Sequence, residues 1–101
     1  MTIVLRDARG RVLVRQRPAQ GLLAGLWEFP EHEHLPPVHD LVEVGIVTHV
    51  FSHFKARYRV HVGRIRSLRV KKPLTWVTLS QLKALALPTA QRRIAHQFIE
   101  D

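Results

Sequence analysis

The chain contains no cysteine among its 101 residues. This excludes disulfides, thiolate zinc sites and cysteine-ligated iron–sulfur clusters within these residues, and it is typical of a reducing compartment. Long apolar runs are also missing, since the longest stretches cover only a few residues and a membrane span needs about 20. Met1 leads directly into a strand-like segment, with no secretory leader pattern. We therefore expect a cytoplasmic protein with no membrane partner.

Acidic residues are scarce. Eight Asp and Glu face sixteen Lys and Arg, so the formal net charge is +8 with the seven histidines neutral. Such an excess attracts polyanions, and nucleic acid is the preferred candidate because no apolar run offers a membrane anchor. The length is that of one domain with a modest core. Composition thus favours a single domain over residues 1–101 that binds nucleic acid.

Strand patterns dominate the first two thirds of the chain. Two β-branched runs, Ile3-Val4-Leu5 and Val12-Leu13-Val14, flank the turn-forming Asp7-Ala8-Arg9-Gly10 and predict a β-hairpin. Longer strand patterns cover residues 42–50 and 54–65. The second of these alternates between an apolar set and a polar set, which are Phe54, Ala56, Tyr58, Val60 and Val62 against Lys55, Arg57, Arg59 and His61. One face of this strand should lie in the core and the other should be cationic.

The last third of the chain is mainly helical in its patterns. After a short strand at residues 76–79, Ser80 is expected to cap a brief helix that runs to about Leu87, where Pro88 stops it. Thr89 is expected to cap a second helix. Its apolar stripe consists of Ala90, Ile94, Ala95, Phe98 and Ile99. Strands first and helices last indicate an α+β fold with a mixed or antiparallel sheet, and the two prolines in residues 31–40 make that segment irregular.

Three groups of residues together resemble one family. They are Gln16-Arg17-Pro18, Gly25-Leu26-Trp27-Glu28-Phe29-Pro30 and His49-Val50-Phe51-Ser52-His53. The chain is similar to the C-terminal domain of the adenine DNA glycosylases of the MutY family, which has a Nudix-like fold. The resemblance covers nearly the whole chain except residues 31–40, and its third group is the most specific. Segments like the second group also occur in Nudix hydrolases, so they bear on the fold more than on the substrate.

The resemblance implies that this chain is the lesion-recognition fragment of a longer protein. Adenine opposite 8-oxoguanine would be excised by an N-terminal catalytic domain with an iron–sulfur cluster. The implied partners are double-stranded DNA with the 8-oxoguanine:adenine mispair and that catalytic domain. A prokaryotic protein of this kind would be associated with the nucleoid. No catalytic residue, metal ligand or cofactor is expected in these residues, so the chain should bind DNA without cutting it.

Similar domains use the loop that holds His49, Phe51, Ser52 and His53 to probe the lesion. Oxidation of guanine turns the N7 acceptor into a donor and adds a carbonyl oxygen at C8. A hydroxyl such as that of Ser52 both donates and accepts, so it can read this altered edge. Phe51 can wedge or stack beside a base step, although an isolated Phe would simply be a core aromatic. The two histidines are expected to hold the loop or to contact phosphate.

The cationic face of the second long strand offers phosphate contacts at Lys55, Arg57 and Arg59. Such contacts supply affinity without sequence information. For any one of these side chains, simple solvation on the outer face of a strand is the commoner outcome. The same two interpretations apply to Arg15, Arg17, Arg92 and Arg93.

Enzymatic alternatives find little support in the residues. Nudix hydrolysis needs several carboxylates on one helix to hold divalent metals. The acids nearest that position are separated by two prolines, so we expect the Nudix-box helix to be missing; they are Glu31, Glu33, Asp40 and Glu43. A Ser52 nucleophile with a neighbouring histidine would lack both a strand-to-helix elbow and an orienting acid.

The group Glu31-His32-Glu33-His34 contains metal-ligand residue types. Alternate residues of an extended segment point in opposite directions, which favours a solvated loop over a metal site. Two functions from other classes stay open as alternatives to lesion recognition. One is a small Nudix-type nucleotide hydrolase, and the other is a catalytically inert protein-interaction domain.

Overall fold

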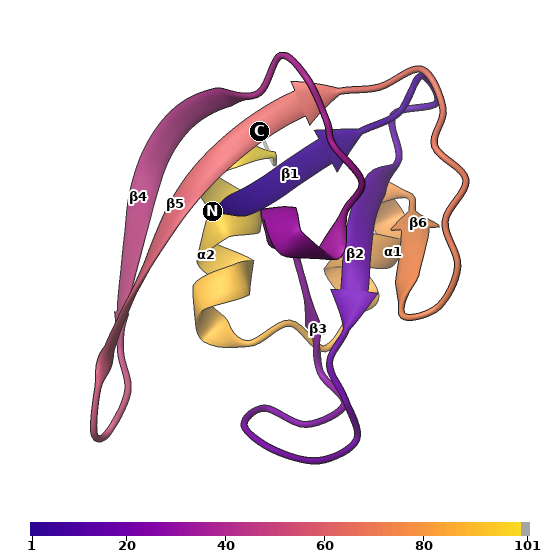
Figure 1. Cartoon of the computed structure of the whole chain (residues 1–101). Helices are drawn as coiled ribbons and strands as arrows, with labels where there is room; N and C mark the ends of the chain where they lie inside the picture. The colour runs from indigo at the N-terminus through magenta and orange to yellow at the C-terminus, as the bar shows by residue number, and fades with distance from the viewer. Residues whose placement is uncertain (100–101) are drawn as a thin grey trace.

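The computed structural model describes residues 1–99, in which a six-stranded mixed sheet carries two helices against one face (Figure 1). The elements are β1 (Thr2–Arg6), β2 (Val12–Gln16), β3 (Trp27–Glu28), a 3-10 turn (His32–His34), β4 (Val42–Val50), β5 (Lys55–Arg64), β6 (Leu74–Val77), α1 (Leu79–Ala84) and α2 (Thr89–Phe98). The strand order is β3-β2-β1-β5-β4, and β6 joins β2. β1 and β5 are parallel and every other pair is antiparallel. The predicted α+β class with a mixed sheet is confirmed.

Local turn chemistry explains the first hairpin. Asp7 accepts hydrogen bonds from the backbone N–H groups of Arg9 (3.0 Å) and Arg11 (2.9 Å). Gly10 takes a φ of +78°, a conformation that other residues adopt only with strain. The side chain of Asp7 is buried although it carries charge. Burial works to raise its pKa, but the hydrogen bonds from Arg11 and Arg9 together with the charge of Arg11 hold that pKa below its ordinary value.

The helix starts differ from the expectation. Thr78, and not Ser80, caps α1: its Oγ1 accepts from the Gln81 N–H (3.1 Å), while Gln81 Oε1 accepts from the Thr78 N–H (2.8 Å). This reciprocal capping box starts the helix two residues earlier than predicted, so β6 must end at Val77. Thr89 was expected as a cap but is the first residue of α2. α1 also ends before Leu87, at Ala84.

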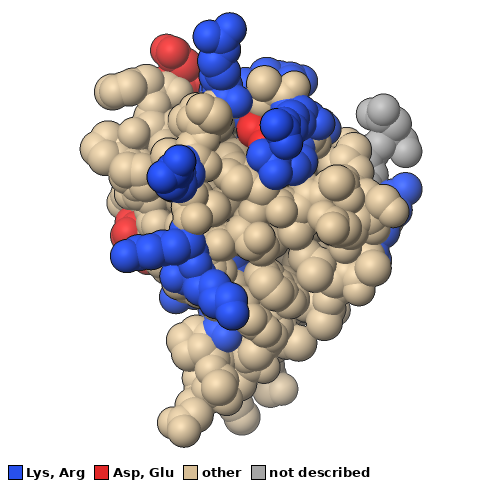
Figure 2. All heavy atoms as spheres, turned by 90° about the vertical axis from the view of Figure 1, so that its right-hand side faces the viewer, with Lys and Arg blue, Asp and Glu red and all other residues tan. Residues whose placement is uncertain are grey.

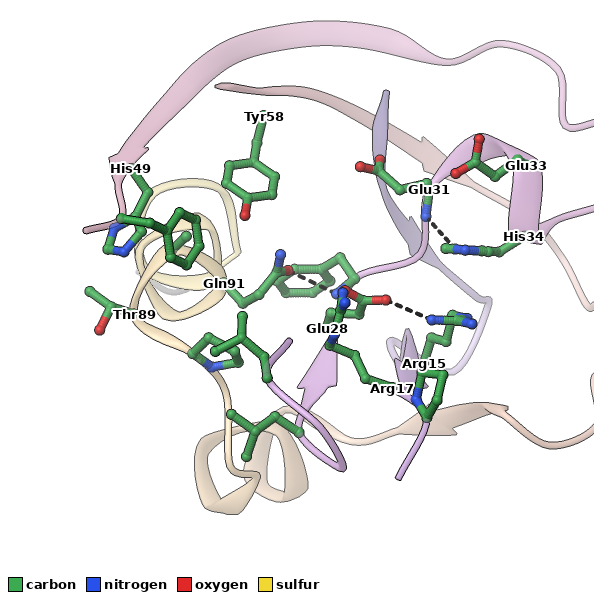
Figure 3. Close-up of a pocket in the computed structure, with 17 residues that line it drawn as sticks. Arg15, Arg17, Glu28, Glu31, Glu33, His34, His49, Tyr58, Thr89 and Gln91 are labelled. Atoms are coloured by element: carbon green, nitrogen blue, oxygen red, sulfur yellow. Dashed lines mark hydrogen bonds and ion pairs between the residues drawn. The ribbon is translucent and has the colours of Figure 1, made fainter. Parts of the chain in front are cut away.

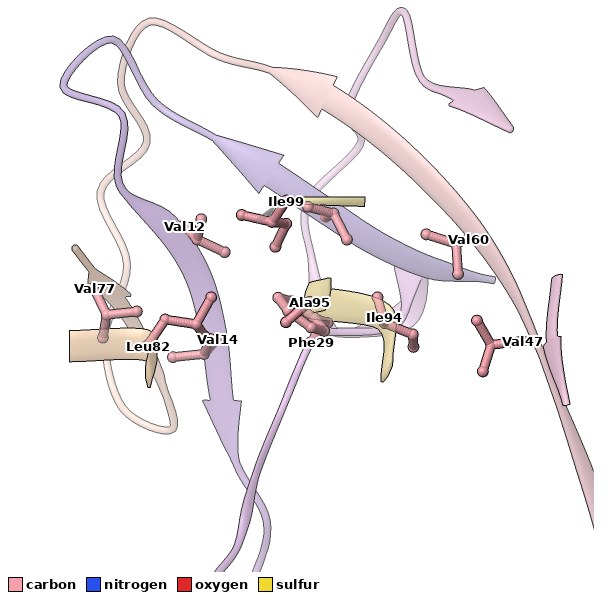
Figure 4. Packing of buried hydrophobic residues seen from close by; sticks show 11 residues of the cluster. Val12, Val14, Phe29, Val47, Val60, Val77, Leu82, Ile94, Ala95 and Ile99 are labelled. Carbon is pink, nitrogen blue, oxygen red and sulfur yellow. The ribbon is translucent and has the colours of Figure 1, made fainter. Parts of the chain in front are cut away.

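Two apolar clusters cover opposite faces of β1 and β2, because alternate residues of a strand point to opposite sides. On one face, Val4, Val12 and Val14 pack against both helices and Phe29 (Figure 4). The apolar stripe predicted for α2 lies here, with Ala90, Ile94, Ala95 and Ile99 buried. On the other face, Ile3, Leu5 and Leu13 are covered by side chains from residues 35–41 and 65–76. The sheet is therefore enclosed on both sides near β1.

Residues 31–40 contain the short 3-10 turn and no α-helix, as the two prolines predicted. The Glu31 N–H donates to Nδ1 of His34 (3.0 Å), so this pair of metal-ligand residue types forms a local cap. Within residues 1–99, no group of three or more His, Cys, Asp or Glu side chains is placed to hold a metal ion. Neither α1 nor α2, the α-helices of these residues, is long and apolar enough to cross a bilayer.

Candidate nucleic-acid interface

The β4–β5 hairpin forms a long arm whose tip projects beyond the rest of the sheet (Figure 1). Two contacts tie β4 to helix α2. Arg93 Nη1 donates to the carbonyl oxygen of Thr48 (2.8 Å). Gly45 lies so close to Phe98 that a Cβ would stand 2.9 Å from the Cζ atom of its ring, so a larger residue there would require the Phe98 ring to shift. The arm is thus held along its length while its tip stays outside the core.

A turn over residues 51–54 closes this arm. The Phe51 N–H donates to the Phe54 carbonyl (2.7 Å), and the two rings stack with centroids 4.5 Å apart. His49 packs edge-on against Phe51, with centroids 4.6 Å apart. Phe54 was predicted on the core face and this is wrong: it is 49% exposed, because β5 starts after it. Ser52 and His53 are exposed and make no hydrogen bond to another residue of 1–99, so a nucleophilic Ser–His pair is not formed.

The predicted alternation of β5 is confirmed over residues 55–60. Ala56, Tyr58 and Val60 turn inward, while Lys55, Arg57 and Arg59 are exposed on the other face. Arg59 is the least available of the three cations, since its Nη2 lies 2.7 Å from Oε1 of Glu43 on β4. Lys55 and Arg57 have no ion pair within the described residues.

The other four arginines considered for phosphate contact have structural partners. Arg92 donates to the carbonyl oxygens of Leu82 (3.3 Å) and Leu85 (2.7 Å), which satisfies the C-terminal end of α1. Arg93 holds β4 as described above. Arg15 and Arg17 both donate to Glu28, each at 2.9 Å.

A cavity of about 550 Å³ lies between the arm, β3 and the start of α2 (Figure 3). His49 and Phe51 line it, so the structure brings these two predicted residues to one site and leaves Ser52 and His53 beyond its lining. Tyr58 and Gln91 face each other across it. Gln91 is buried, and its Oε1 accepts a hydrogen bond from the Phe29 N–H (2.9 Å). This bond joins α2 to the residue that directly follows β3.

Both arginines that line this cavity are paired with one carboxylate. Glu28 is only 8% exposed, and its two carboxylate oxygens are bound by different guanidinium groups, those of Arg15 and Arg17. Sequence analysis missed Glu28 and Gln91 as site residues. The signal was present in both cases as one polar residue in an apolar pattern, within Leu26-Trp27-Glu28-Phe29 and within the stripe of α2.

Two titratable groups at the cavity are shifted toward their neutral forms. Burial lowers the pKa of His34, and the nearby positive charge of Arg15 lowers it further. This agrees with Nδ1 of His34 accepting a hydrogen bond. Burial raises the pKa of Tyr58, and the negative charges of Glu28 and Glu31 add to that shift. The Tyr58 hydroxyl therefore stays protonated and able to both donate and accept.

Comparison with known proteins gives a family and several relatives. The family described as NUDIX domain matches residues 1–97. Adenine DNA glycosylase of Rattus norvegicus is 31% identical over 88% of this chain, and that of Homo sapiens is 31% identical over 83%. The matched regions are 22% and 20% of those proteins, so the chain spans about a fifth of their length.

Solved structures agree with this result. The C-terminal domain of mouse MUTYH, crystallised in complex with human PCNA, aligns with a TM-score of 0.77 and 27% identity, covering 94% of this chain and 82% of that one. RenU, a Nudix hydrolase from M. smegmatis, aligns with a TM-score of 0.60 and 17% identity over 96% of this chain and 85% of that one. The second likeness bears on the fold alone. The predicted Nudix-like fold and the predicted resemblance to adenine DNA glycosylases are both confirmed.

Proposed function

The chain belongs to the NUDIX domain family, and from that premise we propose that it is the lesion-recognition domain of an adenine DNA glycosylase. Its ligand is double-stranded DNA that contains 8-oxoguanine opposite adenine. Residues 1–101 act as one domain beside an N-terminal catalytic domain of the same polypeptide, which excises the adenine and holds the iron–sulfur cluster. Lesion recognition then takes place where the DNA is, which in a prokaryote is the nucleoid within the cytoplasm.

The exposed tip of the β4–β5 arm is the observation that carries this proposal. It offers a hydroxyl at Ser52, an imidazole at His53 and a braced aromatic ring at Phe51. A hydroxyl suits the altered edge of 8-oxoguanine, and an aromatic ring suits a base step. The relatives at 31% identity are adenine DNA glycosylases, which favours this ligand over a free nucleotide.

A second candidate function is protein binding. On the outward face of β4, opposite Arg59 and Lys55 of β5, Ile46 is 45% exposed and Val50 is 67% exposed. β4 is also an edge strand of the sheet, which leaves one side of its backbone unpaired within the described residues. The mouse MUTYH domain was crystallised with PCNA. A protein partner on this strand is compatible with DNA at the tip.

Binding measurements test the lesion-recognition proposal directly. We expect the chain to bind a duplex with an 8-oxoguanine:adenine pair more tightly than the same duplex with guanine:adenine, with affinity falling as salt rises. Fluorescence anisotropy on both duplexes at several salt concentrations measures this. We also expect no magnesium- or manganese-dependent hydrolysis of nucleoside triphosphates or dinucleotides. Equal affinity for the two duplexes, or turnover that a chelator abolishes, would contradict the proposal.

The cationic face of β5 should contribute affinity without lesion preference. Arg57→Gln should weaken binding to both duplexes about equally and lower the slope of log K against log salt by about 0.9, the value for one phosphate contact. Arg59→Gln should have less effect, because Glu43 already holds that guanidinium. An unchanged slope for Arg57→Gln would mean that this side chain is simply solvated.

A further inference from the structure

A second, larger hollow lies at the other end of the sheet from the β4–β5 arm. This groove has a volume of about 840 Å³ and is formed by β2, β6 and the segment 68–73 that leads into β6. In Figure 1, β6 and that segment stand on the opposite side of the molecule from β4. Its chemistry therefore belongs to a surface separate from the tip.

All charged side chains that line the groove are basic. Six basic residues contribute to it, and no Asp or Glu does; they are Arg11, Arg15, Arg17, Arg69, Lys71 and Lys72. The cavity beside the arm differs in this respect, since three acids, Glu28, Glu31 and Glu33, line it together with Arg15 and Arg17. Figure 2 shows Lys and Arg gathered on this side of the molecule with little acidic surface between them. The groove is thus the strongest candidate for an anion in the described residues.

The six cations fall into two sets. Three already have partners: Arg11 pairs with Asp7 at 2.7 Å, and Arg15 and Arg17 hold Glu28. The other three, Arg69, Lys71 and Lys72, are exposed and form no ion pair or side-chain hydrogen bond within residues 1–99. Their charges repel one another, which makes an anionic ligand favourable there.

The backbone that carries these three cations is anchored. The indole N–H of Trp76 donates to the Leu68 carbonyl (2.8 Å), and the Gln16 N–H donates to the Pro73 carbonyl (3.0 Å). The Leu74 N–H closes a turn onto the Lys71 carbonyl (3.0 Å). Arg11 lies over the Trp76 ring, with its Cζ 5.9 Å from the ring centroid. Because the segment is fixed before binding, less conformational entropy is lost when an anion is bound.

We propose that this groove is a second DNA-contact surface, in which Arg69, Lys71 and Lys72 bind phosphates of the duplex backbone. The identity of the polyanion rests on the proposed function, whereas the groove itself does not. Phosphate suits two Lys and one Arg, because ammonium groups act as point charges toward it and need no fixed bidentate geometry. Phosphate contacts carry no base information, so the groove adds affinity and register while the tip reads the lesion. An acidic peptide is the competing ligand.

The test compares two triple variants of the chain that lose the same charge. The groove variant is Arg69→Gln with Lys71→Gln and Lys72→Gln. The control variant is Arg9→Gln with Arg64→Gln and Lys83→Gln, three exposed cations outside the groove. We expect the groove variant to lower the salt slope by close to three, about 0.9 for each phosphate contact. The loss should be equal on 8-oxoguanine:adenine and guanine:adenine duplexes, and the control variant should change the slope by less than one.

The outcomes separate this inference from the proposed function. If the unmodified chain prefers lesion DNA but the groove variant keeps its salt slope, the groove inference is wrong and the lesion proposal stands. If the chain shows no lesion preference but the groove variant still loses slope, the lesion proposal fails and the groove inference stands. A peptide of ten Glu residues is the further probe. Loss of peptide binding in the groove variant with unchanged DNA binding would assign the groove to acidic protein and overturn the inference.

Discussion

Glu28→Ala is expected to lower the free energy of unfolding by about 3 kcal/mol, the low end of the range for breaking a buried ion pair. Removal of this carboxylate leaves the guanidinium groups of Arg15 and Arg17 facing each other without an anion between them. The low end applies because the two side chains keep 19% and 30% exposure, so water screens part of the repulsion. Denaturant titration measures the loss.

A neighbouring carboxylate supplies the matched control. Glu33 lines the same cavity but is exposed, so Glu33→Ala should change stability by no more than about 0.5 kcal/mol. A further variant, with Arg15→Met and Arg17→Met added to Glu28→Ala, should recover much of the loss, because the uncompensated charges are then gone. If Glu28→Ala and Glu33→Ala unfold alike, Glu28 does not hold the two arginines in solution.

The elements that the sequence predicted best are those set by local chemistry. The β1–β2 hairpin follows from Asp7 and Gly10, which close the turn through their own hydrogen bonds and positive φ. The alternation of β5 follows from a period of two. The start of α1 also follows from local chemistry, since Thr78 and Gln81 stand at capping-box spacing, whereas the prediction places the cap at Ser80.

Features that depend on distant residues were not predicted. Glu28 is 13 residues from Arg15 and 11 residues from Arg17 in the sequence. Gln91 and Phe29, which are joined by a hydrogen bond, are 62 residues apart. No periodicity encodes such pairs, because they exist only once the sheet and helix have packed. The basic groove is a similar case. The basic pair Lys71 and Lys72 is visible in the sequence. These residues line the same groove as Arg11 because β6 pairs with β2 in the folded sheet.

The sequence also predicted the hairpin tip in part. The position of residues 51–53 between two strands came from pattern alone, and the family resemblance gave their proposed role. The predicted alternation extends one residue too far and places Phe54 in the core, so it does not include the aromatic stack of Phe51 on Phe54. An alternation of apolar and polar residues does not show at which residue a strand begins, so the turn over residues 51–54 is evident only from the structure.

Phe51→Ala is expected to weaken binding to the 8-oxoguanine:adenine duplex by about 5- to 150-fold, since stacking on a base is worth about 1–3 kcal/mol. Ser52→Ala should lower the preference for that duplex over guanine:adenine only several-fold, because one hydroxyl contact contributes on the order of 1 kcal/mol. Equilibrium binding to both duplexes measures these changes. Adenine excision by the longer glycosylase should survive in both variants, with weaker engagement of the lesion duplex in Phe51→Ala and a smaller lesion preference in Ser52→Ala.

Phe54→Ala is the control that gives the first result its meaning. It removes the same ring stack, with centroids 4.5 Å apart, but leaves Phe51 in place to contact the DNA. If Phe51 contacts the DNA directly, Phe51→Ala should lower the affinity for the 8-oxoguanine:adenine duplex clearly more than Phe54→Ala does, while both variants unfold at similar temperatures. Equal losses would mean that Phe51 only braces the turn. Ser52 lies in the same turn but does not take part in the ring stack. If Phe51→Ala and Ser52→Ala both keep the preference for 8-oxoguanine:adenine over guanine:adenine, the tip has only a structural role and another part of the molecule recognises the lesion.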